Sequence, residues 1–360
     1  MKKILQENPN ISLIHLNDGL MAAFAYFLKK TTDIPVVVTF HGLDLVFPSF
    51  LYQKLAVKYF KKLDGVVTVS KATAEECLNR GFDPKKIFVV KNGVDTDISK
   101  IKKDSSFRNV MEEKLQMSLK DKKVIVSIGR CVRRKGFSWF LKNVMTKLDK
   151  NVLYVIIGPP QNHIKQINFL LKLLPKRLSR MISVGLGFAM DEIEIQEALK
   201  NPELQNRAFY LGKLPFEQMI QFLKNSDLYV MPNIKVNGDA EGFGLVALEA
   251  AICGMPVVAS KLEGITCAIS NNNNGFLIEP ENSNLWSKQI SSLLNDMDDL
   301  VNFGENAKKY TLNNYSWERM CNGYIQVFNK FQNQPQQIES NNDSANVLVA
   351  SNREYSKVAV

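Results

Sequence analysis

Short apolar runs alternate with helical stretches along most of this chain. Runs of this kind are typical of strands buried on both faces, and helices between them indicate parallel sheets covered on both sides. The runs stand at residues 11–14, 36–40, 66–69, 87–90, 124–128, 154–157, 208–211, 228–231 and 256–259. They form two sets, so we predict an α/β fold of two Rossmann-like, doubly wound domains that face each other across a cleft.

The division between the domains is predicted in a polar stretch rich in Lys and Asp, from about residue 96 to 122. We assign residues 1–115 to an N-terminal domain and residues 116–312 to a C-terminal domain. Residues 313–332 contain a helix opened by Tyr-Ser-Trp, which is expected to pack back toward the N-terminal domain. Residues 333–360, rich in Asn, Gln and Ser, are predicted to be a disordered tail.

The composition favours a protein of the cytoplasm. With 360 residues and 45% hydrophobic content, the chain is long enough for two cores. No run approaches the roughly 18 apolar residues that span a bilayer, and the lysine-led start lacks the apolar segment of a secretory signal. The five cysteines form no C-x-x-C pair and the three histidines have no metal-ligand spacing, so we predict no disulfide, metal or other cofactor.

The net charge of +10 favours an anionic partner. This partner could be nucleic acid, an acidic lipid surface or a phosphorylated substrate, and charge alone does not choose among them. Neither a nucleic-acid reader fold nor basic-aromatic interleaving is present, so no nucleic-acid partner is predicted. Residues 165–180 and 51–63 are basic and amphipathic, and either stretch fits peripheral contact with an anionic membrane on its inner face. Ordinary surface helices with buried apolar faces are the favoured alternative.

A glycine-flanked loop, E-G-F-G at 241–244, runs into an apolar helical segment. Gly242 and Gly244 allow the backbone to approach a ligand closely. The amides of Phe243, Gly244 and Leu245 should therefore point outward at a helix N-terminus, where anionic or hydroxyl-rich groups are favoured.

Two glutamates stand at the ends of this segment, Glu241 and Glu249. Eight helical residues rise about 12 Å, so the two carboxylates are expected to bind two ends of one molecule. A glycosidase pair, about 5 to 9.5 Å apart across a single bond, matches this spacing poorly, whereas a nucleoside diphosphate sugar fits it. An acidic helix start followed by an exposed helical Glu is the alternative.

The stretch E-G-F-G-L-V-A-L-E-A-A-I-C-G-M-P-V-V-A-S resembles the E-x7-E region of retaining glycosyltransferases of the GT-B fold, family 4, also called glycosyl transferases group 1. The resemblance implies that Glu241 contacts the donor sugar and Glu249 the donor ribose. It makes the first domain the acceptor side and the second the nucleotide-sugar-binding domain. Relatives usually begin with a further strand, a glycine-rich loop and about two more strand-helix units, so the N-terminal domain is expected to be incomplete.

A second motif, G-R-C-V-R-R-K-G at 129–136, follows the predicted strand at 124–128. It resembles the family's G-R-x-x-x-x-K-G element, which assigns Arg130 and Lys135 to the donor diphosphate. Such cations stabilise the departing phosphate without a metal. A solvated basic loop is the alternative reading, and Arg133 and Arg134 are expected to face solvent.

In the first domain, V-T-F-H-G-L-D at 38–44 resembles the family's T-x-H-G-x-D, whose His reaches the donor sugar. This makes His41 a candidate for the reaction centre, and a hydrogen-bonded structural histidine is the alternative. His15, in a strand run, is expected to be structural.

Weaker matches complete the predicted donor site. K-N-G-V-D at 91–95 matches the turn at the interdomain crossing, where Asn92 is a diphosphate candidate. Gly212-Lys213-Leu214 matches a landmark near the nucleobase, which makes Lys213 and Leu214 donor-site candidates. Where relatives commonly have G-G-x-P-E, this chain has E-G-I-T-C at 263–267, so a Glu is expected to be lost near the donor.

Together these motifs predict a metal-independent, retaining hexosyltransferase with His41, Glu241, Arg130 and Lys135 as its catalytic residues. The donor is a nucleotide-diphosphate sugar, and the acceptor is a hydroxyl of a sugar, polysaccharide or lipid-linked molecule in glycan, polysaccharide or glycolipid synthesis. The alternative is a non-catalytic nucleotide-sugar-binding protein or an inactive fragment. A nicotinamide oxidoreductase ranks far behind, because no G-x-G-x-x-G follows a first strand.

Overall fold

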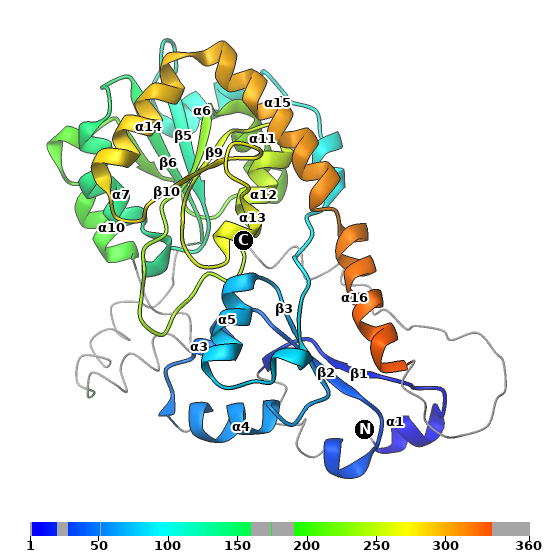
Figure 1. The fold of residues 1–360 in the computed structure, drawn as a ribbon. Coiled ribbons are helices and arrows are strands. Elements are labelled where there is room, and N and C mark those ends of the chain that lie inside the picture. Colours follow the sequence, from blue (N-terminus) through cyan, green and yellow to red (C-terminus); the bar gives the residue numbers. More distant parts are fainter. Residues whose placement is uncertain (1, 20–27, 51, 160–173, 175–190, 333–360) are drawn as a thin grey trace.

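The computed structural model describes residues 2–19, 28–50, 52–159, 174 and 191–332, which form two α/β units (Figure 1). Each unit contains one parallel sheet, and this confirms the predicted fold class. The predicted tail at 333–360 and nearly all of the basic stretch at 165–180 lie outside the described residues.

The N-terminal unit is built on a four-stranded sheet in the order β1-β2-β3-β4. The strands are β1 (Ile14–Leu16), β2 (Val36–Phe40), β3 (Gly65–Thr68) and β4 (Ile87–Val89). The helical segments are α1 (Lys2–Glu7), α3 (Leu43–Val46), η2 (Tyr52–Ala56), α4 (Val57–Phe60), α5 (Lys71–Asn79) and η3 (Pro84–Lys86). Every residue of β2 and β3 is buried, as expected for the central strands of a parallel sheet.

The C-terminal unit is built on a six-stranded sheet in the order β10-β9-β8-β5-β6-β7. Its strands are β5 (Lys123–Ile128), β6 (Val152–Ile157), β7 (Ala208–Tyr210), β8 (Leu228–Met231), β9 (Val257–Ser260) and β10 (Phe276–Ile278). Its helical segments are η4 (Thr96–Lys100), α6 (Phe107–Leu115), η5 (Arg133–Lys135), α7 (Phe137–Asn143), η6 (Met145–Lys147), α10 (Glu192–Ala198), η7 (Pro202–Leu204), α11 (Phe216–Asn225), α12 (Leu245–Ile252), α13 (Ile265–Ala268), α14 (Ser283–Asn295) and α15 (Met297–Asn314).

Both faces of this larger sheet are covered. Along β5, Val124 and Val126 belong to one apolar cluster, whereas Ile125 between them belongs to a second cluster. Side chains alternate between faces along a strand, so an uninterrupted apolar run supplies two cores at once. This is why the Val- and Ile-rich runs were sufficient to predict the sheet.

Two connections join the units. After β4 the chain crosses at Val94, whose amide donates to the Tyr315 carbonyl at 2.7 Å. The segment that follows was assigned from sequence to the first domain, but its buried side chains pack in the core of the second: Ile98, Phe107, Met111 and Leu115. The chain returns through α16 (Trp317–Gln332), which runs from the end of α15 to the N-terminal unit in Figure 1. Val327 of α16 packs there with Val37 and Val67.

The second basic stretch, 51–63, is an ordinary surface element among its described side chains. Val57, Phe60 and Leu63 are buried in the core of the N-terminal unit, while its lysines are exposed. The structure therefore agrees with the favoured alternative for this stretch. Among the described helices, none is long and apolar enough to cross a membrane.

Candidate active site

The candidate site lies at the carboxyl ends of β5 and β8, where the loops that follow these strands pack tightly together. A Cβ on Gly136 would lie 2.0 Å from the Pro232 carbonyl oxygen, and its φ of 68° is in the left-handed region, so only glycine fits. Two residues earlier, the Arg134 carbonyl accepts the Ile234 amide at 2.9 Å. This packing places the η5 turn directly beside the loop that leads to Glu241.

Glu241 is the centre of a buried polar network. Its Oε2 accepts from the Lys135 ammonium at 2.6 Å and from the Asn233 amide at 3.2 Å. The Arg134 guanidinium also bonds to Oε2, and its Nε donates to Asp239 Oδ1 at 3.1 Å. The predicted proximity of Lys135 and Glu241 is therefore present, within a four-charge cluster that the sequence did not predict.

The placement of Arg134 corrects the expectation that both neighbouring arginines face solvent. Its side chain is only 12% exposed, whereas Arg133 is exposed as predicted. In the single turn of η5 consecutive side chains point in different directions, and the position of the acidic partners in space decides which arginine turns inward. The sequence R-R-K alone does not contain this information.

The cluster keeps the Glu241 carboxylate ionised. Burial alone would raise its pKa, but the charges of Arg134 and Lys135 outweigh burial and lower the pKa to about 2. Burial also lowers the pKa of Lys135, and Arg134 adds to this effect while Glu241 opposes it. Glu241 is thus a fixed negative charge within hydrogen-bond distance of two cations.

Glu263 is a site residue that sequence reasoning missed. Its Oε2 accepts the Glu241 amide at 2.6 Å, and the Gly264 amide donates to the Glu241 carbonyl at 3.0 Å, so Glu263 and Gly264 hold the Glu241 backbone on both sides. The fifth position, where relatives have Glu, is Cys267 as expected, and the carboxylate found here belongs to the first position of E-G-I-T-C. Burial raises its pKa to about 7. Its φ of 48°, uncommon for a residue other than glycine, is the signal of strain at this turn.

Glu249 lies on α12, which begins after Gly244 in the left-handed conformation. Burial raises the pKa of Glu249 to about 7, and its Oε2 is buried with no hydrogen-bond partner in the described part of the chain. The amides of Phe243 and Gly244 likewise find no acceptor among the described residues. Leu245 is 36% exposed. Acceptor and donor groups are therefore available along the predicted donor-binding segment.

His41 reaches this loop from the N-terminal unit. A Cβ on Gly242 would lie 1.8 Å from the His41 carbonyl oxygen, so the turn after β2 and the E-G-F-G loop are in direct contact. The His41 ring is exposed and its Nε2 donates to the Asn17 carbonyl at 2.9 Å, while the Asp44 carboxylate accepts the His41 and Gly42 amides. His15 instead bonds to Thr39 Oγ1 at 2.8 Å and packs on Tyr324, in agreement with a structural role.

The remaining candidates lie around this centre or away from it. Arg130 is exposed at the end of β5, and Lys213 is exposed after β7. Leu214 is buried in the core. Asn92 lines a cavity of about 220 Å³ at the interdomain crossing, together with Tyr315 at the end of α15.

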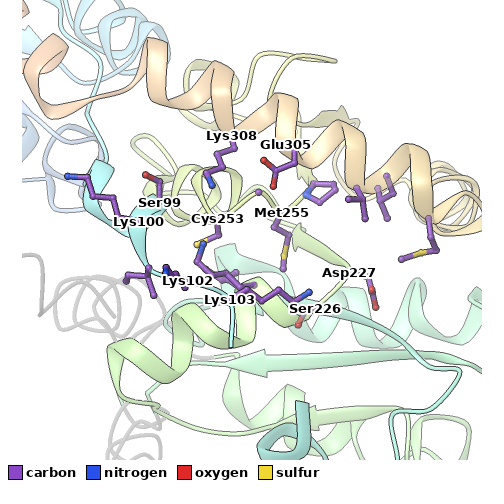
Figure 2. A pocket seen from close by; sticks show the side chains of 18 residues that line it. Ser99, Lys100, Lys102, Lys103, Ser226, Asp227, Cys253, Met255, Glu305 and Lys308 are labelled. Carbon is purple, nitrogen blue, oxygen red and sulfur yellow. The ribbon is translucent and has the colours of Figure 1, made fainter. Parts of the chain in front are cut away.

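A larger cavity, of about 530 Å³, lies at the opposite edge of the six-stranded sheet (Figure 2). It is lined by Asp227 and Pro256, which immediately precede β8 and β9, and by five lysines. It is thus separate from the predicted site, which follows the ends of the strands. Across the described ranges, no group of His, Cys, Asp and Glu side chains is arranged to hold a metal ion.

Comparison with known proteins gives two family matches. The model described as "Glycosyl transferases group 1" matches residues 111–310, and the one described as "Glycosyltransferase Family 4" matches residues 1–98. Among curated relatives, an uncharacterized glycosyltransferase of Methanocaldococcus jannaschii is 27% identical over 286 residues, 79% of this chain and 63% of that protein. A D-inositol 3-phosphate glycosyltransferase of Corynebacterium urealyticum is 24% identical over 347 residues, 92% of this chain and 74% of its own length. The chain thus spans less than two thirds of the first of these relatives.

Solved structures share the fold. HepE of Anabaena, in complex with UDP and glucose, superposes with a TM-score of 0.70 at 19% identity, over 92% of this chain and 80% of that one. A glycosyltransferase from Rickettsia africae gives a TM-score of 0.71 at 21% identity, with the same coverage of 92% and 80%.

Proposed function

Because the chain belongs to the glycosyl transferases group 1, we propose that it transfers a sugar from a nucleotide-diphosphate sugar to an acceptor hydroxyl. The finer proposal is a retaining, metal-independent transfer of a hexose-type sugar in glycan, polysaccharide or glycolipid synthesis. A location in the cytoplasm, with peripheral contact to the inner face of a membrane, remains part of the proposal.

The observation that carries this proposal is the meeting of Lys135, Glu241 and the His41 turn at one place. Lys135 comes from the loop after β5, Glu241 from the loop after β8, and His41 from the turn after β2 in the other unit. Carboxyl ends of parallel strands are where α/β folds bind ligands. The donor sugar would lie at Glu241 and His41, and its diphosphate at Lys135 and Arg130.

The nucleoside end of the donor is supported by Glu249. A buried carboxylate oxygen without a partner among the described residues fits an acceptor for ribose hydroxyls. The uridine nucleotide in the HepE complexes makes UDP-sugars the first donors to test.

The cations would supply most of the catalysis. Negative charge develops on the diphosphate as the sugar leaves, and preorganised cations in a partly buried site stabilise that charge most in the transition state. The acceptor hydroxyl would attack from the same face as the departing phosphate, which retains the configuration of the sugar without a protein nucleophile.

A ligand screen followed by turnover assays tests the proposal. Thermal shift against UDP-, GDP- and ADP-sugars should give a rise in melting temperature with one class of donor. Release of the free nucleotide should then be measured with sugar and lipid-linked acceptors. Lys135→Ala should reduce turnover by about 10²-fold or more, because it removes a cation from the leaving phosphate. Donor binding without hydrolysis or transfer would favour the non-catalytic alternative, and undiminished turnover in Lys135→Ala would reject the assignment.

A further inference from the structure

The Arg134 side chain bridges two carboxylates. Its Nε donates to Asp239 and its Nη1 bonds to Glu241, while the side chain is 12% exposed. The planar guanidinium presents donors in a fixed fork, so it can engage two carboxylates at once in a single geometry. Asp239 thereby fixes the direction from which Arg134 approaches Glu241.

The charges in this network determine how well Lys135 can bind a phosphate. The network contains two cations, Arg134 and Lys135, and two anions, Asp239 and Glu241. Without Arg134, Lys135 would be the single cation beside Asp239 and Glu241, so the network would carry a net charge of −1 and would repel a phosphate. With Arg134 bridging Asp239 and Glu241, the network is neutral overall, and Glu241 shares its Oε2 between Lys135 and a second cation.

We propose that Arg134 is a positioning residue that offsets the negative charge around Lys135 and so allows Lys135 to bind the diphosphate of the donor as well as Glu241. The inference rests on the proposed function, since it concerns the diphosphate subsite of that same site. Arg134 itself does not touch the ligand. Its effect passes through Glu241, and this separates it from a direct phosphate ligand.

Two neighbouring arginines provide a matched comparison. Arg134 is buried against Asp239 and Glu241, whereas the adjacent Arg133 is exposed in the same turn. Arg134→Gln and Arg133→Gln each remove one positive charge, at positions one residue apart. A general electrostatic effect on phosphate binding would therefore appear in both variants, and the proposed effect only in the first. Arg134→Lys keeps the charge but lacks the fork that bridges two carboxylates.

The experiment compares the affinities of each variant for UDP and for uridine, by calorimetry or ligand-observed NMR, after circular dichroism has shown that the variant is folded. If the donor screen identifies GDP or ADP, that nucleotide and its nucleoside are used. Arg134→Gln should weaken UDP binding about tenfold or more while uridine binding changes less than about twofold. Arg134→Lys should fall between Arg134→Gln and the parent, and Arg133→Gln should match the parent within about twofold.

A double variant distinguishes the indirect effect from direct contact. In Arg134→Gln with Glu241→Gln, the carboxylate that competes for Lys135 is gone, so UDP affinity should return to within about threefold of the parent. If Arg134 bound the phosphate directly, the second substitution would not restore affinity, and that result would overturn the inference. Unchanged UDP affinity in Arg134→Gln would overturn it as well. If the parent protein bound no nucleoside diphosphate, the proposed function would fail, and the inference with it.

Discussion

Glu241 and Glu249 stand on one segment but experience opposite electrostatic environments. Two cations hold the Glu241 carboxyl at a pKa of about 2, whereas burial without a hydrogen-bonded cation raises the pKa of Glu249 to about 7. Near neutral pH the first is always ionised and the second is poised between its two forms. The two acids therefore respond differently to pH despite their common helix and loop.

This difference predicts a pH-dependent effect of Glu249→Gln on stability. The folded-state pKa of Glu249 is raised above its ordinary value of 4.5, so the folded protein becomes relatively less stable as pH rises from about 4.5 through 7. The substitution removes that cost. Its stabilising effect should be larger at pH 8 than at pH 5 by about 1–2 kcal/mol, after a discount for partial exposure.

Urea unfolding of the parent and Glu249→Gln at both pH values measures this effect. Glu113→Gln, an exposed substitution of the same kind on α6, is the control and should change the free energy of unfolding equally at both. An equal effect of Glu249→Gln at pH 5 and pH 8 would show that the buried carboxyl does not titrate in this window.

The meeting of Lys135, Glu241 and the His41 turn was predictable from the sequence, but the surroundings of these residues were not. Lys135, Glu241 and His41 follow predicted strands, so parallel-sheet geometry alone brings the first two to one edge. The burial of Arg134 and the clamp at Glu263 depend on how the loops after three different strands pack against one another. No spacing in the sequence specifies that packing.

At the scale of secondary structure, the central strands of the sheets were predicted more accurately than two of the strands at the sheet edges. The runs at 36–40 and 228–231 coincide with β2 and β8, because buried Val- and Leu-rich segments have few other places in an α/β fold. The first strand was predicted at 11–14 but is Ile14–Leu16, which pairs with Val36–Val38, and β10 was missed. Both are three-residue edge strands, where a partner on one side decides the register and local hydrophobicity gives little signal.

Helix α16 docks on the N-terminal sheet, and we predict that a series of side-chain hydrogen bonds between them contributes measurably to the free energy of unfolding. Tyr324 Oη lies 3.2 Å from Thr39 Oγ1, which lies 2.8 Å from His15 Nε2, so a helix residue is linked to two adjacent strands. Tyr324→Phe keeps the ring and removes this link. It should lower the free energy of unfolding by about 1 kcal/mol in urea titrations, the usual value for one buried hydrogen bond.

The neighbouring side chain offers the control for this substitution. Ile325 on the same helix is 50% exposed, so Ile325→Ala should change stability by less than about 0.5 kcal/mol. If the two substitutions cost the same, α16 would be held by its general helical packing and not by the Tyr324–Thr39 contact.

The two units meet where the His41 turn abuts the E-G-F-G loop, and this contact depends on the absence of a side chain at Gly242. The φ of Gly242 lies outside the left-handed region, so alanine would cause no local backbone strain. Its Cβ would instead lie 1.8 Å from the His41 carbonyl oxygen of the other unit. Gly242→Ala should therefore push the two units apart at this contact without disturbing the core of either unit.

Gly242→Ala should accordingly separate activity from stability. The reacting groups must be accurately oriented, and a displacement of about 1 Å between His41 in one unit and Glu241 in the other disturbs that orientation. Turnover of the identified donor should therefore fall about 10²-fold. The radius of gyration from small-angle scattering should increase in the presence of UDP, with little change in melting temperature. Gly158→Ala is the matched control, because its Cβ would lie 2.0 Å from the Gly129 carbonyl oxygen within one unit. That variant should lower the melting temperature without a change in radius, and the same pattern in Gly242→Ala would mean that the loop yields locally and the units stay together.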